Sequence, residues 1–206
     1  MTTKIIIIGA SGFGKEVAWI IGRMNSVAPM FEIEGFCDDA PDKQEGMFAG
    51  YPLLGALANV KPTGLGFICA IGDNRARQRV TAQAVGAGFS PVTVIDPTAA
   101  IAPDAVIGAG SFVGIGSIVS VGARLGKGVV VNNQVCVGHD ATLGDFAQAC
   151  PGVHISGGCD IGEGALLGTN AATLPLKKIG AWSTLGIGTT ALRDIPDNAT
   201  IIRLNG

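Results

Sequence analysis

A six-residue period runs through the second half of the chain without a break. Counting every sixth residue from Ile95 to Leu185 gives sixteen positions, and all except Ala149 and Thr173 are isoleucine, leucine or valine. The following residue is glycine in nine cases: Gly108, Gly114, Gly126, Gly138, Gly144, Gly162, Gly168, Gly180 and Gly186. Chance does not hold one register over so many repeats, and a hexapeptide repeat is typical of a parallel β-helix.

Each hexad predicts one short strand and one turn, with the aliphatic residue pointing inward onto its equivalents in neighbouring coils. The glycine beside it lets the chain turn where a Cβ would crowd the next coil. Three hexads close a triangular coil of about 18 residues, so we expect roughly five coils. Apolar or small residues on the outer surface predict a homotrimer with clefts between subunits. These outward residues are expected to be Val121, Val129, Val135, Ala147 and Val153.

The first ~90 residues alternate strand-like and helix-like patterns instead. Strands are predicted at 4–8, 33–37, 66–71 and 92–95, and helices at 15–24 and 75–85. This alternation predicts a small, doubly wound, Rossmann-like α/β domain. We therefore expect two domains, residues 1–92 and 93–206.

Charge and composition exclude several kinds of partner. The net charge is −2, with 14 basic and 16 acidic residues, and no basic run is present to bind nucleic acid. The apolar runs are shorter than the ~20 residues that span a membrane, and Ile5–Ile8 is expected to be a buried strand. The five cysteines are odd in number and form no CxxC motif, which favours free thiols in the cytoplasm.

A glycine-rich turn in the first domain predicts a nucleotide site. The segment 9–14 follows a strand and precedes a helix, an arrangement that cradles phosphates through backbone N–H groups. Two carboxylates end the second predicted strand, where they either accept hydrogen bonds from ribose or base, or are merely solvated. Four strands are half of a dinucleotide fold and suit one nucleotide-sugar. The candidate residues are Gly9, Ser11, Gly12, Asp38, Asp39, Gly72 and Asn74.

Only two histidines occur, His139 and His154. Histidine is the usual general base because imidazole titrates near neutral pH. His139 lies two places after the inward Val137, which predicts a turn position with its ring outside. The adjacent Asp140 can orient that ring, although a solvated surface pair is the alternative. His154 is expected to occupy a turn or contact a neighbouring subunit.

Five motifs occur in a characteristic order, at residues 9–12, 38–39, 70–74, 138–140 and 167–170. In this order the chain resembles the hexapeptide-repeat acyltransferases with an N-terminal nucleotide-sugar-binding domain. It is most similar to UDP-4-amino-sugar N-acetyltransferases of bacillosamine type and to sialic acid O-acetyltransferase-like proteins. The resemblance implies a left-handed β-helix, acetyl-CoA as cosubstrate, active sites at subunit interfaces and N-acetylation of a nucleotide-linked amino-sugar. O-acetylation and a non-catalytic nucleotide-sugar-binding scaffold remain alternatives.

The resemblance also implies roles for residues of the β-helix. His139 would be the general base, Asp140 its partner, and the N–H of Gly157 the donor to the thioester oxygen. Ala172, Gly186 and Gly188 are expected to be neighbours of CoA. Gln148 stands where relatives have a second histidine, and is expected to contact substrate.

Two further features bear on this resemblance. The tail 201–206 differs from the Gly-Val-Pro-Ala-Lys ending of many relatives, which predicts a different C-terminal part of the CoA site. The carbonic-anhydrase-like β-helices hold each metal with three histidines, and this chain has two, so no metal is expected.

Overall fold

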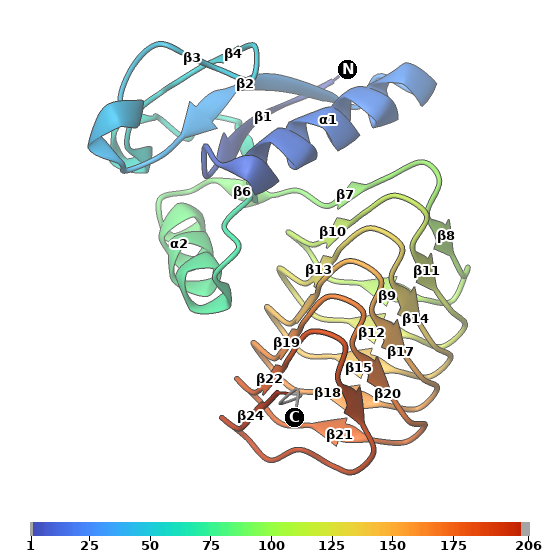
Figure 1. Cartoon of the computed structure of the whole chain (residues 1–206). Coiled ribbons are helices and arrows are strands. Elements are labelled where there is room, and N and C mark those ends of the chain that lie inside the picture. The colour runs from blue at the N-terminus through green and yellow to red at the C-terminus, as the bar shows by residue number, and fades with distance from the viewer. Residues whose placement is uncertain (1, 203–206) are drawn as a thin grey trace. The chain divides into compact units, whose positions relative to one another are not determined.

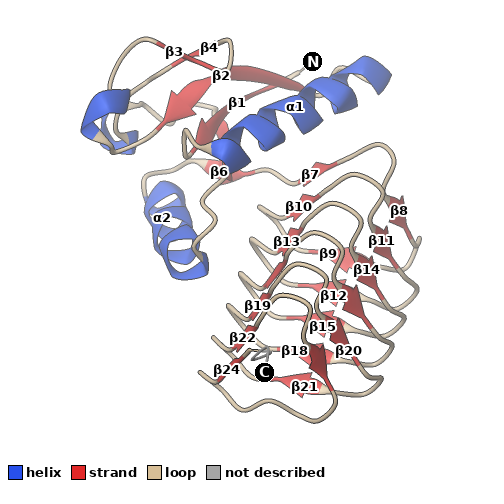
Figure 2. Ribbon diagram, viewed as in Figure 1, coloured by secondary structure: helices blue, strands red, loops and turns tan. Residues whose placement is uncertain are grey.

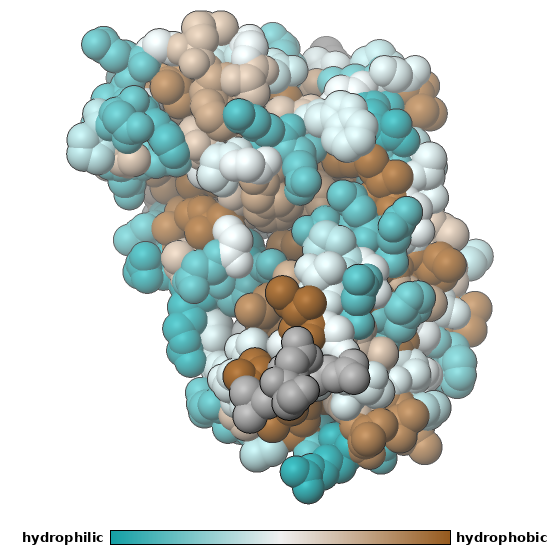
Figure 3. Space-filling model, viewed as in Figure 1, coloured by the Kyte–Doolittle hydropathy of each residue, from teal (hydrophilic) through white to brown (hydrophobic). Residues whose placement is uncertain are grey.

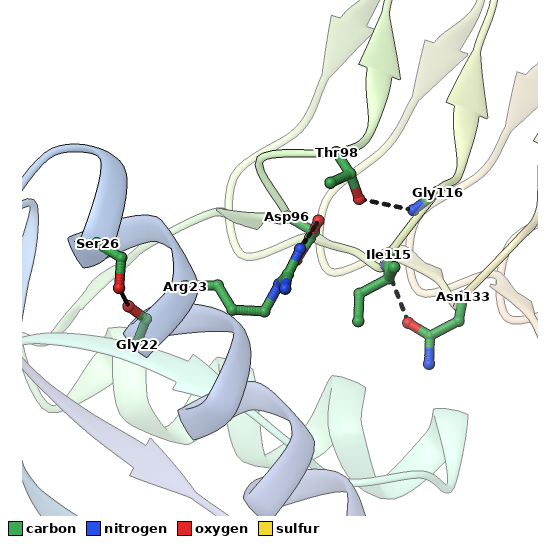
Figure 4. A network of polar contacts seen from close by, with 8 residues as sticks. All are labelled: Gly22, Arg23, Ser26, Asp96, Thr98, Ile115, Gly116 and Asn133. Atoms are coloured by element: carbon green, nitrogen blue, oxygen red, sulfur yellow. Dashed lines mark hydrogen bonds and ion pairs between the residues drawn. The ribbon is translucent and has the colours of Figure 1, made fainter.

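A computed structural model describes residues 2–202 of the chain and divides it into two compact units, residues 1–97 and 98–206 (Figure 1). The division falls a few residues after the expected one at 92/93. An ion pair explains part of this difference: Arg23 Nε lies 2.6 Å from the buried carboxylate of Asp96 (Figure 4). This contact holds the segment before Pro97 to the first helix of unit 1.

Unit 1 is a four-stranded parallel sheet with two helices. The strand order is β2 (Phe31–Cys37), β1 (Thr3–Ile8), β5 (Gly66–Cys69) and β6 (Ser90–Pro91). The helices are α1 (Gly12–Val27) and α2 (Asn74–Gly86), and the remaining elements are η1 (Pro41–Lys43), β3 (Met47–Phe48), β4 (Tyr51–Pro52) and η2 (Leu57–Asn59). The order of the strands reverses between β1 and β5, and ligands of such sheets bind at this switch point.

The Rossmann-like prediction for unit 1 is confirmed in its class and corrected in its details. The sheet takes Ser90–Pro91 as its fourth strand, whereas the prediction was 92–95. Val94–Ile95 forms β7, which is not part of this four-stranded sheet but pairs with β10. Helix α1 begins at Gly12, inside the segment expected to be a turn. Gly14 permits this because a Cβ there would collide with the carbonyl oxygen of Gly9.

Unit 2 is a left-handed parallel β-helix of about six turns (Figure 2). Its two-residue strands stack into three flat faces. Face 1 contains β10 (Phe112–Val113), β13 (Val130–Val131), β16 (Gln148–Ala149), β19 (Leu166–Leu167), β22 (Thr184–Leu185) and β24 (Thr200–Ile201). Face 2 contains β8 (Ala100–Ile101), β11 (Ile118–Val119), β14 (Cys136–Val137), β17 (His154–Ile155), β20 (Ala172–Thr173) and β23 (Thr190–Ala191). Face 3 contains β9 (Val106–Ile107), β12 (Arg124–Leu125), β15 (Thr142–Leu143), β18 (Asp160–Ile161) and β21 (Lys178–Ile179).

In most hexads the interior takes two residues. The expected aliphatic residue ends each strand, and a second, smaller residue lies two positions before it. This second set includes Ala123, Val129, Val135, Ala141, Ala147, Val153, Cys159, Ala165 and Ala171, all at most 1% exposed. The outward placement of Val129, Val135, Ala147 and Val153 was therefore wrong, and only Val121 of that group is exposed. Small side chains at this second position suit the narrow corners of a triangular core.

The repeat continues beyond Leu185, which is why the helix has about six turns where roughly five were expected. Its last turn is shorter than the others. In the regular coils a turn amide meets a carboxylate 18 residues on, as Lys127 N–H does with Asp145. In the last coil the spacing is 16, from Ala181 N–H to Asp197. The tail residues 203–206, for which a difference from relatives was predicted, lie outside the described part of the chain.

From Gly110 to Gly188, each corner of the β-helix has a residue with positive φ, and after Gly110 larger side chains alternate there with glycine from coil to coil. At the corner between faces 3 and 1, the ring of Phe146 covers Gly128 and the indole of Trp182 covers Gly164. Polar contacts link the corners between coils as well: Asn133 Oδ1 accepts from Ile115 N–H at 2.9 Å (Figure 4). The coils are therefore held in register by their corners as well as by their strands.

Candidate active site

His139 and Asp140 lie at the corner between faces 2 and 3, directly after β14. Their backbone is fixed from both sides, because Asp140 N–H donates to Val121 O and His139 O accepts from Gly158 N–H. Asp140 has a φ of 57°, a left-handed conformation that aspartate tolerates better than most residues. One carboxylate oxygen of Asp140 lies where a Cβ of Gly122 would be. The glycine of the previous coil thus makes room for the aspartate.

The side chains of His139 and Asp140 form a hydrogen-bonded pair. His139 Nδ1 lies 2.9 Å from Asp140 Oδ2. When Nδ1 carries the proton, it donates to the carboxylate and leaves Nε2 as the acceptor. Both side chains are open to solvent in the single chain, with exposed fractions of 67% and 72%. The pair therefore has the geometry of a general base and the carboxylate that orients it, but in the single chain both side chains remain open to solvent.

Gly157 lies directly beneath the imidazole of His139. A Cβ at Gly157 would collide with the ring, closest to Nε2. Gly157 O accepts from Leu176 N–H, whereas Gly157 N–H has no hydrogen-bond partner among residues 2–202. A backbone donor without a partner thus lies beside the proposed base, where it can bind an oxyanion.

The residues predicted to contact CoA border face 2. Ala172 lies on face 2 in β20, beside His154, while Gly157 lies at its corner with face 3. Gly186 and Gly188 follow β22, at the opposite corner of the same face. Gln148 is on face 1 and half-buried, so a single chain does not bring it to the corner that holds His139.

A separate cavity of about 230 Å³ lies in unit 1, at the carboxyl ends of β1, β2 and β5. It contains three of the predicted residues, Gly9, Asp38 and Asp39. Its other lining residues are Ile8, Cys37, Leu57, Ile71, Ala76, Arg79, Val80 and Gln83. The residues from α2 were not predicted, although their i, i+3, i+4, i+7 spacing marks one face of a helix.

Asp38 and Asp39 have different environments. Asp38 accepts hydrogen bonds from Ala10 N–H (2.8 Å) and Ala40 N–H (3.0 Å), and Lys43 Nζ is 3.6 Å away. Burial opposes ionisation of Asp38, but these N–H donors and the Lys43 ammonium outweigh it and hold the pKa of its carboxyl below its ordinary value. Asp39 is exposed, and within residues 2–202 its carboxylate has no hydrogen-bond or ion-pair partner. Asp38 therefore organises the glycine-rich turn, whereas the Asp39 carboxylate is open to solvent.

The remaining predicted residues of unit 1 lie around the helix starts. Ser11 is the N-cap of α1 and makes no side-chain capping bond, and a Cβ at Gly12 would meet open space. Such an uncapped N-terminus is a ready anion site. Asp73 caps α2 by accepting from Ala76 N–H, while Gly72 and Asn74 flank it and do not line the cavity.

Other features of the described residues bear on chemistry. All five cysteines are free thiols, and burial raises the pKa of Cys37 to about 12. Residues 2–202 contain no cluster of three or more histidine, cysteine, aspartate or glutamate side chains placed to bind a metal ion. Within the same range no helix has the length and apolar character to cross a membrane.

Comparisons with known proteins agree with this two-part arrangement. The PglD N-terminal domain family matches residues 4–84, and a search of curated proteins found no match. The acetyltransferase domain of PglB from Neisseria gonorrhoeae FA1090, solved with acetyl coenzyme A, is 35% identical, with a TM-score of 0.89 over 97% of this chain and 96% of that one. PerB from Caulobacter crescentus, solved with CoA and GDP-perosamine, is 30% identical, with a TM-score of 0.88 over 96% and 92%.

A more distant structure, WeeI from Acinetobacter baumannii AYE, shares the fold at 24% identity, with a TM-score of 0.75 over 98% of this chain and 97% of that one. A hexapeptide β-helix that follows a nucleotide-binding α/β unit defines a class of acyltransferase. Within that class, the chain belongs to the nucleotide-sugar acetyltransferase family.

Proposed function

We propose that this protein transfers the acetyl group of acetyl-CoA to the amine of a nucleotide-linked amino-sugar, with His139 as the general base. The observation that carries the proposal is the stacking of His139 over Gly157 with Nδ1 fixed by Asp140. The complexes of PglB with acetyl-CoA and of PerB with CoA and GDP-perosamine support both substrates.

The reaction proceeds by direct attack. The sugar amine adds to the thioester carbonyl while His139 Nε2 takes its proton, and Asp140 stabilises the imidazolium that forms. The carbonyl oxygen, which becomes negative, accepts a hydrogen bond from Gly157 N–H. When the tetrahedral intermediate collapses, the C–S bond breaks and CoA leaves as a thiolate. The thiolate then takes up the proton that His139 Nε2 removed from the amine. No acyl-enzyme forms.

The nucleotide portion of the substrate binds in unit 1. The diphosphate meets the uncapped start of α1 at Ser11 and Gly12, and the nucleoside enters the cavity beside Gly9 and Asp39. We propose in the same way that Gly72 and Asn74, at the end of the third strand, help to close the nucleotide site. Because such nucleotide-sugars and acetyl-CoA are cytoplasmic metabolites, we place the protein in the cytoplasm, in keeping with its free thiols.

A homotrimer completes the active site in this proposal. Asp, Glu, Lys and Arg are absent from the first strand positions of faces 1 and 2, whereas face 3 has Arg124, Asp160 and Lys178 there. Face 3 therefore suits solvent, and faces 1 and 2 suit neighbouring copies. Apolar residues are otherwise scattered among polar ones on the side of the molecule in Figure 3. A neighbouring copy would enclose the exposed His139 pair and the predicted CoA residues Ala172, Gly186 and Gly188.

The same assembly would explain the position of Gln148. This residue is on face 1, so it can approach a His139 only across a subunit boundary. There its amide can hold the substrate or a water molecule.

The test is turnover of nucleotide-linked amino-sugars with acetyl-CoA, followed by release of the CoA thiol. His139→Ala should lower kcat at least about a hundredfold, the scale of losing a general base. His154→Ala removes the only other histidine. Because His154 lies on face 2 beside Ala172, its loss should act on CoA binding or assembly and leave kcat at saturating acetyl-CoA within a few-fold. A kcat near that of wild type in a folded His139→Ala protein would refute His139 as the base. Acetylation of sugar hydroxyls alone would refute the amine acceptor.

A further inference from the structure

Thr173 is an exception in the inward series of the β-helix. Of the sixteen positions from Ile95 to Leu185, it is the only one with a polar side chain. The side chain is nevertheless inside the β-helix, with an exposed fraction of 4%. Because a buried hydroxyl needs hydrogen-bond partners, the contacts of Thr173 indicate its role.

The strand ladder of face 2 is interrupted at Thr173. β17 and β20 pair only through His154 and Ala172, whereas the neighbouring strand pairs of this face have two paired residues each. One coil earlier, Gly138 N–H donates to a backbone carbonyl of the next coil at 2.8 Å. The equivalent N–H, that of Ser156, donates to the side-chain Oγ1 of Thr173 at 2.9 Å instead. A side-chain oxygen therefore takes the place of a backbone carbonyl in the ladder.

The hydroxyl of Thr173 belongs to a polar network inside the β-helix. Thr173 O, which the ladder does not use here, accepts from Ser156 Oγ at 2.6 Å. Cys159 Sγ lies 3.2 Å from Thr173 Oγ1 and donates to Leu174 O at 3.2 Å. The protons fit without conflict: the thiol donates to the carbonyl, the Thr173 hydroxyl donates to sulfur, and its oxygen accepts from Ser156 N–H. Such a satisfied network holds its members in one arrangement.

This network lies immediately before the backbone N–H that is proposed to bind the thioester oxygen. Ser156 precedes Gly157, and both its N–H and its hydroxyl are bound to Thr173. In the coil that holds His139, the same corner is closed by a hydrogen bond between backbone atoms three residues apart. Within residues 2–202, Cys159 N–H and Ser156 O form no such bond. Contacts with Thr173 thus replace two contacts that the repeat normally supplies at this corner.

We propose that Thr173 is a positioning residue for the reaction, and that its hydroxyl directs the Gly157 N–H towards the thioester oxygen. This rests on the proposed function, in which the same N–H binds the developing oxyanion. Without the hydroxyl, Ser156 N–H returns to the carbonyl of residue 173, as in the preceding coil, and the next peptide turns with it. Because an oxyanion donor acts on the transition state, its misdirection lowers the rate more than it weakens substrate binding.

Thr173→Val and Thr173→Ser separate the effect of the hydroxyl from that of the fold. Valine keeps the branched shape and is common in the inward series, so Thr173→Val should melt at or above the wild-type temperature. Its kcat should fall at least about tenfold, part of what a whole oxyanion donor contributes, with KM for acetyl-CoA within about twofold. Thr173→Ser loses a buried methyl group and should melt lower, but it keeps the hydroxyl and should retain kcat within a few-fold. The order of stability and the order of activity are therefore expected to be opposite.

Ser111→Ala is the control for loss of a buried hydroxyl. Ser111 Oγ also bonds backbone atoms of the next coil, accepting from Val129 N–H and donating to Gly126 O, both at 3.1 Å. It lies at the corner between faces 3 and 1, away from the corner of His139. This variant should lose stability and keep the wild-type kcat.

A second comparison decides the matter if Thr173→Val does not fold. Thr173→Ala and Thr173→Ser both lack the methyl group, and only serine has the hydroxyl. The serine variant should then have a kcat at least about tenfold above that of the alanine variant. Equal kcat values would overturn the role of the hydroxyl.

The outcomes separate this inference from the function on which it rests. A folded Thr173→Val protein with wild-type kcat, or a Thr173→Ser protein as slow as Thr173→Val, would overturn the role of the hydroxyl and leave His139 as the base. An equal loss of kcat in Ser111→Ala would do the same, because any buried hydroxyl would then matter. If the wild-type protein transfers no acetyl group to an amino-sugar, the proposed function fails and this inference fails with it.

Discussion

The imidazole of His139 occupies the space in which any side chain at Gly157 would begin. Two residues in adjacent coils are thus matched. His139 supplies the ring, and Gly157, which has no side chain, leaves space for it and has a backbone N–H without a partner in the described chain. The β-helix makes this match possible because each coil places its corner directly over the corner of the next one.

Gly157→Ala should therefore damage catalysis more than folding. The new Cβ would displace the exposed ring of His139, which can move aside, and would narrow access to the Gly157 N–H. We expect kcat to fall about a hundredfold, as for loss of one oxyanion donor, with a melting temperature close to wild type. Steady-state kinetics and a thermal scan check this. Wild-type kcat in a folded Gly157→Ala protein would contradict the proposed geometry.

Asp140→Asn should reduce kcat less than His139→Ala does. Asparagine tolerates the left-handed backbone at this corner and still offers an oxygen to Nδ1, but it stabilises the imidazolium less. Asp140→Val is a contrasting variant, because a β-branched residue at a φ of 57° is strained and should lower stability as well. A loss for Asp140→Asn as large as for His139→Ala would mean that the aspartate does more than orient the ring.

Assembly should depend on face 2 and not on face 3. Ile118 and Val106 are the first residues of strands on these faces and are similarly exposed, at 45% and 47%. Ile118→Asp should weaken a trimer, because it would bury a charge at the interface between subunits. Val106→Asp should leave the mass of the assembled protein unchanged. Light scattering measures the mass of each. A fully active wild-type monomer would refute sites shared between subunits.

Acid should destabilise unit 1 through Asp38. Because the pKa of Asp38 is lower in the folded protein than in the unfolded chain, its stabilisation is complete above the ordinary aspartate pKa of about 4. The stabilisation is lost as pH falls through the lowered value. Asp38→Asn should flatten the dependence of the melting temperature on pH in this acidic range. Asp39→Asn is the control and should keep the wild-type slope; equal slopes for all three proteins would contradict this role.

The corners at which an aromatic ring covers a glycine of the neighbouring coil should be more sensitive to substitution of that glycine than the open corners are. Gly164 and Gly188 have nearly the same φ, 62° and 63°, but a Cβ at Gly164 would enter the Trp182 indole whereas one at Gly188 meets open space. Gly164→Ala should therefore cost about 1–3 kcal/mol more unfolding free energy than Gly188→Ala. Denaturant titration measures both, and equal losses would show that backbone strain alone matters.

The repetitive part of this structure could be predicted in detail because the repeat is local. An inward residue every six positions fixes strand, turn and face without knowledge of distant residues, so the β-helix and the corner position of His139 followed from the sequence. The second inward position was missed because it holds alanine, valine or cysteine, and this mixture of residue types forms no recognisable pattern in the sequence. The shorter last coil was missed because it breaks the period after Ala191.

The sequence by itself determined the β-helix, the α/β unit before it and the neighbouring His139 and Asp140. Only the tertiary structure decided which residues meet across coils and strands. It set Gly157 beneath the imidazole and gave Asp38 to the turn at Ala10 while leaving Asp39 open. It also placed Arg79 on the cavity. The physical reason is that these contacts join segments that are adjacent in space but separated along the chain, and no local pattern encodes such distances.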